Sequence, residues 1–536
     1  MTRRQIMVVF GGVMLGMLLA ALDQTIVATA LPRIVEDLKG FQHLSWVVTA
    51  YLLTSTVTVP LYGKLSDLYG RRKLFIFSIT VFLIGSALSG LSQNMTQLIL
   101  FRGLQGLGAG GILPLSLIVI GDLFSPRERG RYQGFTGAVF GASSVIGPLL
   151  GGYLTDHASW RWIFYINLPV GAIALFVIAT TMHMPFERRE HRVDYLGAAV
   201  LSAGVTSLLL VAVWGGTTYA WASPAIVGLA VAGVVLLVLF TLVERRAPEP
   251  VLPLSLFQNG IFRVSNSASL LIGGAMFGTI VFIPVFVQLV IGSSATNSGV
   301  VLIPLMLAVV ASVVVSGQMV TRTGRYKVFP ISGSVFALAG FWMLSRLDVD
   351  ATSLQATMAM IVIGLGIGQM MQVYTLAVQN AAVRSEMGIA TASTQFFRSI
   401  GGTFGVAILG AVLTSRLGTE LAARLGAAGA KLDPRALTDP TVARKLSPAV
   451  FEAVRQSLAV SLHTVFVMAL PLMVAALVLS LLLKEIPLRT TANVHAAAEV
   501  GLEVGTATEE GARELSAAAS GSEDSETAGA RRAGAG

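Results

Sequence analysis

A single carboxylate lies within the first long apolar segment of the chain, residues 7–29. The acid is Asp23, and the surrounding sequence ALDQTIVATALP contains no other charged side chain. An ionised group at the centre of a bilayer costs at least ~2.5–3.5 kcal/mol, so a carboxylate there is a functional hypothesis by default. Asp23 is the only acid that we place well inside a membrane span. An isolated titratable acid among apolar helices suggests a proton site, and a proton site suggests coupled transport.

Two arginines also fall within apolar segments. Arg102 lies about one helical turn inside its segment, and Gln105 follows on the same helix face. Arg398 lies in the polar sequence STQFFRSIGG. A permanent cation in a membrane needs a counter-charge or water. Arg102 near Asp23 would favour the ionised carboxylate, although the sequence alone leaves this proximity open. The alternative for Arg102 is a side chain that extends to the membrane surface.

The composition predicts a protein with many membrane spans. Of 536 residues, 54% are hydrophobic and 12% are charged, about half the charged fraction of soluble domains. The formal charge of +9 comes from short loops between apolar segments, so a lipid surface explains it better than nucleic acid. The absence of cysteine excludes disulfides and thiolate metal sites. The first apolar run is too long for a signal peptide and ends without a small-residue cleavage site, so we expect a retained helix.

Windows of about 20 apolar residues predict fourteen membrane-spanning helices. They lie near residues 7–29, 45–63, 74–92, 98–121, 133–155, 162–182, 194–214, 224–243, 264–290, 298–320, 328–346, 353–377, 393–415 and 460–483. With the N-terminus inside, Lys and Arg concentrate in the inside loops as far as helix 13, as cytoplasmic loops require. The fold class is therefore an all-α polytopic membrane protein with both termini cytoplasmic.

Two segments depart from this alternation. Residues 416–459 form a long outside loop, whose pattern predicts short amphipathic helices on the outer face of the bundle. The tail from about residue 487 is rich in Ala, Gly, Glu and Ser and has few large apolar residues, so we expect disorder there.

Several motifs resemble those of one transporter family. GKLSDLYGRRK at 63–73, which repeats weakly as GQMVTRTGRYK at 317–327, resembles the loop 2–3 signature of the major facilitator superfamily. LILFRGLQGLGAG at 98–110 resembles its helix 4 signature, and GASSVIGPLLGG at 141–152 is similar to the helix 5 signature of its antiporters. ALDQTIVATALP and WRWIFYINLPVG at 160–171 are typical of the fourteen-helix drug:proton antiporter branch. Internal repeats are also common in secondary transporters.

The resemblance implies a domain plan and a set of functional residues. Two six-helix bundles, 1–182 and 264–486, would flank two inserted helices within 183–263, followed by the tail 487–536. Asp23 and Arg102 would couple transport to protons. A conformational latch would comprise Gly63, Asp67, Gly70 and Arg71, and an antiporter hinge would comprise Gly141, Gly147, Pro148, Gly151 and Gly152. For the helix 5 glycines, tight helix packing without a ligand is the alternative that we prefer. For Arg71, the alternative that we prefer is a solvated loop residue that keeps the loop on the inside.

Polar and aromatic residues of several spans are candidates for a substrate cavity, with ordinary packing as the alternative for each. They are Trp46, Tyr51, Gln105, Asn266, Gln369, Gln372, Tyr374 and Arg398. The branch signature often has Asn where this chain has Ala28, so one polar contact is missing. A single membrane acid favours monovalent cations or neutral lipophiles over dications.

The sequence therefore predicts a proton-coupled multidrug efflux antiporter in the cell (inner) membrane that exports lipophilic, cationic compounds. The alternative is an exporter of one dedicated metabolite, antibiotic or lipid with the same coupling. We expect a monomer whose partners are small lipophilic substrates, protons and the lipid bilayer, with no nucleic acid, metal or cofactor. No HExxH, GxSxG or phosphate-binding GxxxxGK[ST] motif is present, which argues against an enzyme or an ATP-driven pump.

Overall fold

The structure is a computed structural model that describes residues 2–38, 44–183, 194–216, 218–292, 295–430, 437 and 446–488. Residues 487 and 488 apart, the predicted disordered tail lies outside these residues, as does most of the middle of the predicted outside loop.

The first half of the chain forms one bundle of helices. These are α1 (Arg3–Leu38), α2 (Leu44–Tyr69), α3 (Arg71–Leu91), α4 (Met95–Leu123), α5 (Pro126–His157), α6 (Trp162–Tyr165) and α7 (Asn167–Thr181). A linking pair, α8 (Tyr195–Trp214) and α9 (Pro224–Glu244), and the short 3-10 helix η2 (Leu254–Gln258) follow.

The second half forms another bundle. Its elements are α10 (Gly260–Val285), η3 (Phe286–Val290), α11 (Ala295–Thr323), α12 (Val328–Ser345), α13 (Ser353–Ala381), η4 (Arg384–Glu386), α14 (Met387–Ala430) and α16 (Pro448–Leu482). Separate apolar cores fill the two bundles.

In the described part of the chain, thirteen helices or helix pairs are long and apolar enough to cross a membrane. They coincide with thirteen of the predicted spans, and α6 and α7 together form one of them. The fourteenth predicted span is α2, a helix of 26 residues. Several Ser and Thr side chains, such as Thr54 and Ser55, reduce its hydropathy, and its length still suffices to cross the hydrocarbon layer.

Local sequence signals fix where the central helices begin. The first N–H groups of a helix lack intrahelical acceptors, so side chains at the start commonly accept them. Asn94 accepts a hydrogen bond from Gln97 N at 2.9 Å at the start of α4. A capping box of Ser125 and Glu128 begins α5, with Pro126 in its first turn. The second cap lies directly before the basic residues Arg127–Arg131.

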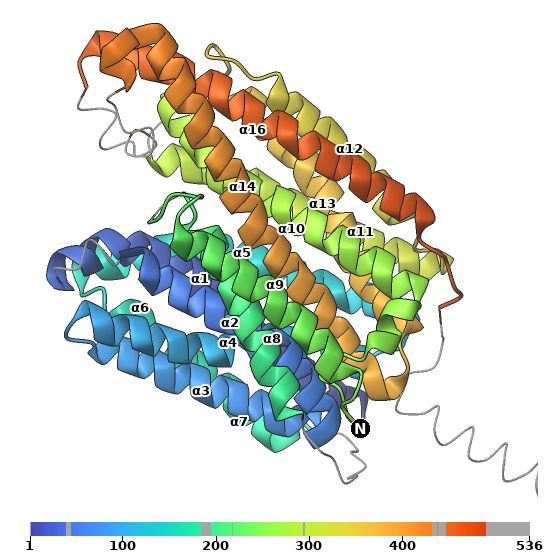
Figure 1. Cartoon of the computed structure of the whole chain (residues 1–536). Helices are drawn as coiled ribbons and strands as arrows, with labels where there is room; N and C mark the ends of the chain where they lie inside the picture. The colour runs from blue at the N-terminus through green and yellow to red at the C-terminus, as the bar shows by residue number, and fades with distance from the viewer. Residues whose placement is uncertain are drawn as a thin grey trace, which may run out of the picture.

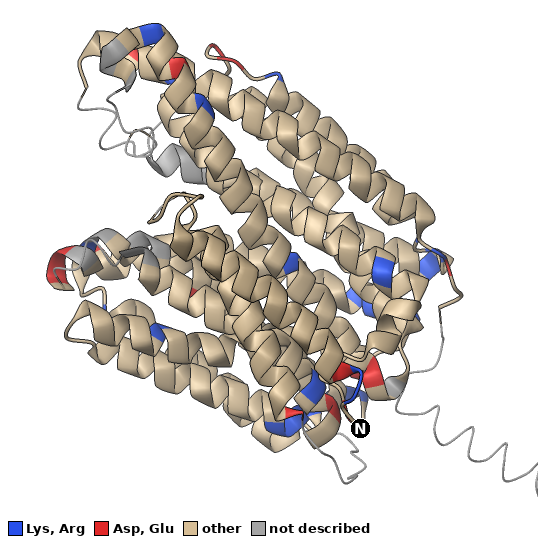
Figure 2. Ribbon diagram, in the orientation of Figure 1, with Lys and Arg blue, Asp and Glu red and all other residues tan. Residues whose placement is uncertain are grey.

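The two bundles contact each other mainly at one end of the molecule. We call this the basic end: it comprises the loops α2–α3, α4–α5 and α11–α12 with the adjoining helix turns, which carry Arg71–Lys73, Arg127–Arg131 and Arg322–Lys327. The chain's N-terminus lies there, and the helices of the two bundles diverge toward the opposite end (Figure 1). Charged residues gather near the two ends, and the helices between them are almost free of charge (Figure 2).

The linking pair lies along one seam between the bundles (Figure 1). Helix α8 contacts both α2 of the first bundle and α14 of the second. A shared apolar cluster includes Val59 of α2, Val205 of α8, Phe240 of α9 and Phe396 of α14. At the opposite end, the rings of Trp46 and Trp214 pack edge to face with centroids 5.3 Å apart. The pair is therefore built into the contact between the halves.

The predicted outside loop differs from expectation at both of its ends. Helix α14 continues through residue 415 to Ala430, and α16 begins at Pro448. The amphipathic pattern at 416–430 belongs to an extension of a spanning helix, because a helix that leaves the bilayer shows the same periodicity as one lying on its surface. Gly426, at φ 59°, is the non-helical residue near the end of α14.

Candidate functional site

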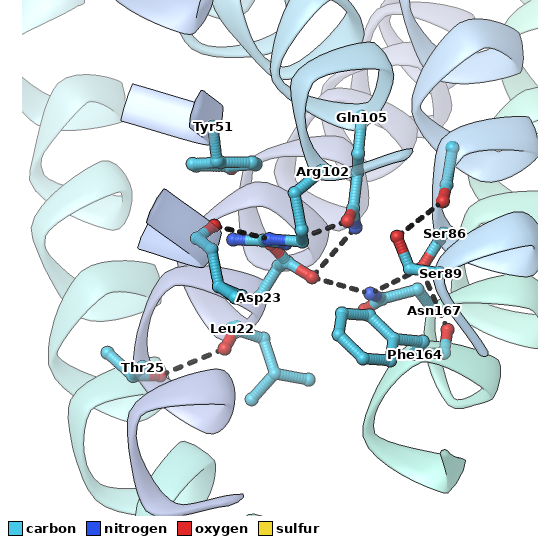
Figure 3. Close-up of polar contacts among 12 residues, drawn as sticks. Leu22, Asp23, Thr25, Tyr51, Ser86, Ser89, Arg102, Gln105, Phe164 and Asn167 are labelled. Atoms are coloured by element: carbon cyan, nitrogen blue, oxygen red, sulfur yellow. Dashed lines mark hydrogen bonds and ion pairs between the residues drawn. The ribbon is translucent and has the colours of Figure 1, made fainter. Parts of the chain in front are cut away.

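Asp23 lies at the centre of a hydrogen-bonded network inside the first bundle (Figure 3). Arg102 Nη1 of α4 is 2.7 Å from Asp23 Oδ2, so the two residues that the sequence could not place together form an ion pair. Gln105 Nε2 and Asn167 Nδ2 donate to Asp23 Oδ1 at 2.8 and 2.9 Å. The Asp23 side chain is fully buried. Both carboxylate oxygens therefore have donors, and the negative charge has one buried counter-charge.

The network extends to a third and a fourth helix. Asn167 is the first residue of α7, and its Nδ2 group also contacts Ser86 Oγ of α3 at 3.0 Å. Ser86 Oγ in turn donates to the carbonyl of Phe164 at 2.8 Å. Side chains of α3, α4 and α7 thus surround the carboxylate of α1 and fix its position (Figure 3).

Aromatic rings cover the cation of this pair. The Arg102 guanidinium carbon lies 4.1 Å from the centroid of the Tyr51 ring and 5.8 Å from that of Phe164. Arg102 also donates to Gln105 Oε1 at 2.7 Å. A desolvated ion pair such as this one is sensitive to protonation, because neutralising one partner leaves the other charge buried alone.

The predicted latch residues join the two halves at the basic end. Asp67 accepts hydrogen bonds from the backbone N–H groups of Gly388 (3.1 Å) and Ile389 (3.0 Å) in the first turn of α14. A carboxylate is favoured there by the unpaired N–H groups and the helix dipole. Gly63 faces the same turn: a Cβ atom built on it would lie 3.1 Å from the carbonyl oxygen of Gly388. Gly70 has φ 91°, a conformation favoured by glycine, and allows the sharp turn into α3.

Arg71 connects this latch to α4. Its Nη1 atom lies 2.5 Å from Asp67 Oδ1, and its Nε atom donates to Asp122 Oδ2 at 3.0 Å. Asp122 and Arg102 both belong to α4. One helix therefore carries a partner of the Asp23 network and a partner of the latch.

The weak repeat of the latch motif forms a second contact between the halves. Gly317 aligns with Gly63 and packs against α5, where a Cβ atom built on Gly130 would lie 3.1 Å from Gly317 Cα. Thr321 aligns with Asp67, and its carbonyl oxygen accepts from Arg127 Nε at 3.0 Å. The repeat thus preserves close helix packing but replaces the carboxylate by a backbone acceptor.

Glutamine side chains of α13 add hydrogen bonds between the two halves at the basic end. Gln372 Nε2 donates to the carbonyl of Gly130 at 2.8 Å, and Gln379 Nε2 donates to that of Leu117 at 3.1 Å. Gln133 Nε2 donates to Gln379 Oε1 at 3.3 Å. Gln372, a candidate for the substrate cavity, instead holds the halves together.

The predicted hinge residues take different positions along α5. Gly141 packs against Val310 of α11, and a Cβ atom built on it would lie 2.9 Å from Val310 Cγ2. Gly147 packs against Thr25 of α1, and Gly151 is buried. Gly152 does not pack tightly, because nothing lies within 4 Å of a Cβ atom built on it. Helix α5 runs unbroken through Pro148, so hinge movement remains a prediction.

Several cavity candidates pack within their own bundle or against the linking pair, and their place in a substrate cavity stays a prediction. Gln105 belongs to the buried Asp23 network, and Trp46 packs on Trp214 of α8. Gln369 accepts from Ser332 of α12 at 2.7 Å. The Tyr374 hydroxyl lies 2.7 Å from Ser480 Oγ of α16. Because α13 is buried on most of its surface, its sequence does not distinguish the faces that contact neighbouring helices from a face that would line a cavity.

The remaining candidates are Tyr51, Asn266 and Arg398. Tyr51 covers Arg102, as described above. Asn266 Nδ2 donates to the carbonyl of Phe262 at 2.8 Å, and its Oδ1 atom is buried without a hydrogen-bond partner among the described residues. Arg398 Nη2 donates to Gln395 Oε1 on the preceding turn.

Sequence reasoning missed Asn167, Asp122 and Gln379 as contributors to these networks. Asn167 lies within the WRWIFYINLPVG motif, so the motif offered a signal. Asp122 and Gln379 lie near helix ends, where polar residues are common and a partner cannot be read from spacing.

At the opposite end, a polar contact ties α1 to the segment before α6. Trp160 Nε1 donates to Asp37 Oδ2 at 2.9 Å, and Arg161 Nη1 lies 3.2 Å from the same oxygen. The hydrogen bond from Trp160 is the largest cause of a lowered pKa of Asp37, and the positive charge of Arg161 acts in the same direction.

Comparison with known proteins decides the family. The model of the Major Facilitator Superfamily matches residues 13–194 and 185–406. The chain belongs to the major facilitator superfamily. It is accordingly a multi-pass membrane transporter and not an enzyme.

Two relatives from Bacillus subtilis (strain 168) match most of this transporter. Multidrug transporter protein MdtP is 41% identical over 502 residues, covering 89% of this chain and 93% of the relative. Multidrug resistance protein 3 is 38% identical over 492 residues, covering 90% and 96%.

Solved structures share the fold at low sequence identity. The proton:xylose symporter XylE has a TM-score of 0.61 at 14% identity, covering 93% of this chain and 100% of that one. A bacterial homologue of the human lysosomal transporter Spinster has a TM-score of 0.55 at 14% identity, covering 90% and 98%. These likenesses confirm the predicted all-α major facilitator fold.

Proposed function

We propose that this protein is a proton-coupled multidrug efflux antiporter that exports lipophilic, cationic compounds by alternating access. The names of the Bacillus relatives support multidrug export. The observation that carries the proton coupling is the buried Asp23–Arg102 pair, with 2.7 Å between Oδ2 and Nη1. Proton binding to Asp23 would remove the counter-charge of Arg102 and so would destabilise the present arrangement of α1 and α4.

The basic end would face the cytoplasm, because Lys and Arg concentrate in cytoplasmic loops. Both termini would then be cytoplasmic, and the protein would act as a monomer in the cell (inner) membrane. The latch and the contacts of Gln372 and Gln379 would close the cytoplasmic side. The present conformation would then be closed toward the cytoplasm, and Asp23 would take up its proton from the outside.

Helix α4 would transmit proton binding to the latch. Arg102 and Asp122 are 20 residues apart in the sequence, so they lie roughly 30 Å apart along a helix axis. A small shift or rotation of α4 after loss of the Asp23 charge would displace Asp122 and, through Arg71, weaken the hold of Asp67 on α14. In this order of events, protonation of Asp23 would open the cytoplasmic side. A potential of 100 mV supplies ~2.3 kcal/mol per charge, which sustains roughly a fiftyfold gradient.

The test is export of several unrelated cationic dyes from proteoliposomes with an imposed pH gradient. Asp23→Asn should abolish gradient-driven accumulation while leaving the protein folded, because the amide preserves the shape but cannot exchange a proton. Asp37→Asn, which changes a half-exposed acid on the same helix, is the matched control and should transport like the parent. Uphill transport by Asp23→Asn at the parental rate would refute proton coupling through this site. Export of only one compound would favour a dedicated exporter.

A further inference from the structure

Arg398 is a buried cation without a carboxylate partner in the described part of the chain. The residue is 9% exposed and lies in the fourth turn of α14. Its Nη2 atom donates to Gln395 Oε1, a neutral acceptor on the same helix. Arg102, the other arginine deep in a span, has Asp23 as its counter-charge. A guanidinium has five N–H donors and stays charged, so Arg398 keeps donors available for a further acceptor.

The direction of the Arg398 side chain follows from the faces of α14. Gln395, Ser399 and Thr403 recur every four residues and so form one polar face. Thr403 Oγ1 donates to the carbonyl of Ser399 at 3.1 Å, as expected for hydroxyls within an apolar span. Because Arg398 donates to Gln395, its guanidinium turns toward this polar face.

The other side of α14 is apolar. Phe397, Phe404 and Ile408 follow a second stripe, and Ile408 is 52% exposed. Phe397 packs on Phe257, with ring centroids 6.4 Å apart. Exposed apolar residues of a spanning helix face lipid, whereas polar ones face the protein interior or water. Phe397 and Phe404 pack on the apolar cluster shared with α2, α8 and α9, so the polar face of α14 points away from that cluster.

Helix α10 packs against α14 at the turn that carries Arg398. A Cβ atom built on Gly273 would lie 3.0 Å from the carbonyl carbon of Arg398, so the two backbones are close. Asn266, two helical turns before Gly273, lies on the same face of α10. An arginine side chain in a helix slants toward the helix N-terminus, which in α14 is the direction of the basic end. The cation thus has Gln395 as its neutral acceptor, and α10 packs beside the backbone of the same turn.

We propose that Arg398 binds the carboxylate, or an equivalent acidic group, of lipophilic substrates. This inference rests on the proposed export function and extends its substrates from cations to zwitterions and organic acids. A guanidinium binds a carboxylate through two parallel hydrogen bonds, and Gln395 holds it in place. Asp23 does not compete for the role, because it is enclosed in the first bundle and already paired.

The test compares two dyes that differ by one methyl ester, the cation rhodamine 123 and its free acid rhodamine 110. Binding to the purified full-length protein is measured by fluorescence anisotropy without a gradient, and export is measured in proteoliposomes with a pH gradient. Arg398→Gln should weaken binding of the free acid at least about tenfold, the loss expected for a charged hydrogen bond. Binding of the ester should stay within about twofold.

Two further variants separate recognition from folding. Arg398→Lys keeps the charge and should retain part of the preference for the free acid. Arg416→Gln removes an exposed arginine from the same helix and should change the binding of neither dye. If Arg398→Gln does not fold, Arg398→Lys carries the test, with an expected severalfold loss for the free acid alone.

Equal losses for both dyes, or no loss for either, would overturn the proposal, as would a parent protein that binds only the ester. Binding that follows these expectations without gradient-driven export would instead refute the proposed proton coupling and leave the role of Arg398 supported.

Discussion

Asp67→Asn should loosen the closed basic end by a predictable amount. Asp67 bridges the halves through two backbone N–H groups, those of Gly388 at 3.1 Å and Ile389 at 3.0 Å. Asparagine offers one acceptor oxygen in place of two and no charge. The substitution therefore removes one of the two hydrogen bonds between the halves, and the remaining bond has an uncharged acceptor.

The size of the effect follows from these two contacts. A hydrogen bond to a charged group contributes ~1.5–3 kcal/mol and a neutral one ~0.5–1.5 kcal/mol. The pairing of Asp67 with Arg71 lies within the first half, so it is present on both sides of the equilibrium and contributes little to the difference. The lower part of these ranges gives a net change of ~2 kcal/mol, which shifts the ratio of closed to open basic ends roughly thirtyfold.

A cysteine reporter measures this ratio, because the chain contains no cysteine of its own. Val314 of α11 faces Gly134 of α5, and a Cβ atom built on that glycine would lie 3.1 Å from Val314 Cγ2. A maleimide should label Val314→Cys only when the halves separate. Its labelling rate should rise roughly thirtyfold with Asp67→Asn, in proportion to the open population.

Asp122→Asn is the matched control, since Asp122 contacts Arg71 and forms no hydrogen bond to the second half within the described residues. It should raise the rate much less than Asp67→Asn. Equal rates in the two variants, or an unchanged rate in Asp67→Asn, would show that the cross-half hydrogen bonds do not hold the basic end closed.

Three further outcomes are expected. Asn167→Leu removes a donor from the buried Asp23 carboxylate, so gradient-driven export should fall at least about tenfold while dye binding persists; unchanged export would exclude Asn167 from the coupling network. Gln372→Leu breaks the bond to Gly130 and should raise labelling of the same cysteine reporter severalfold, and a slower rate would contradict this. The lowered pKa of Asp37 means that its ionised form stabilises the fold above the usual carboxylate value of about 3.9, and that this stability is lost as the pH falls through the lower folded value. The difference in Tm between the parent and Asp37→Asn should therefore shrink as the buffer is acidified from about pH 5 to pH 3, and a constant difference would contradict the assignment.

The order of the spans could be predicted because hydropathy and loop charge are local properties of the sequence. The basic loops after α2, α4 and α11 identify one end of the bundle without any knowledge of packing. Helix α2 could be assigned despite its hydroxyl residues, because the charge alternation fails without it.

The partners within the site depend on tertiary packing. Asp23 could be singled out by its cost in a membrane, but Asn167 reaches it only because α7 begins beside α3 and α1. Gln369 and Gln372 show the limit most clearly. They are three residues apart on a helix that is buried nearly all round, yet one contacts α12 and the other contacts α5. Hydrophobic periodicity cannot assign a direction where every direction is occupied by protein.

The linking pair α8–α9 makes the two flanks of the transporter unequal. Helix α2 contacts α14 directly on one flank and α5 contacts α11 on the other, and the pair lies over the first of these contacts. Movement of the halves must therefore displace or bend the pair on its own side. The α5–α11 flank lacks such a pair among the described helices, so in the proposed rocking motion it would present membrane-dissolved compounds with the less obstructed side of the molecule.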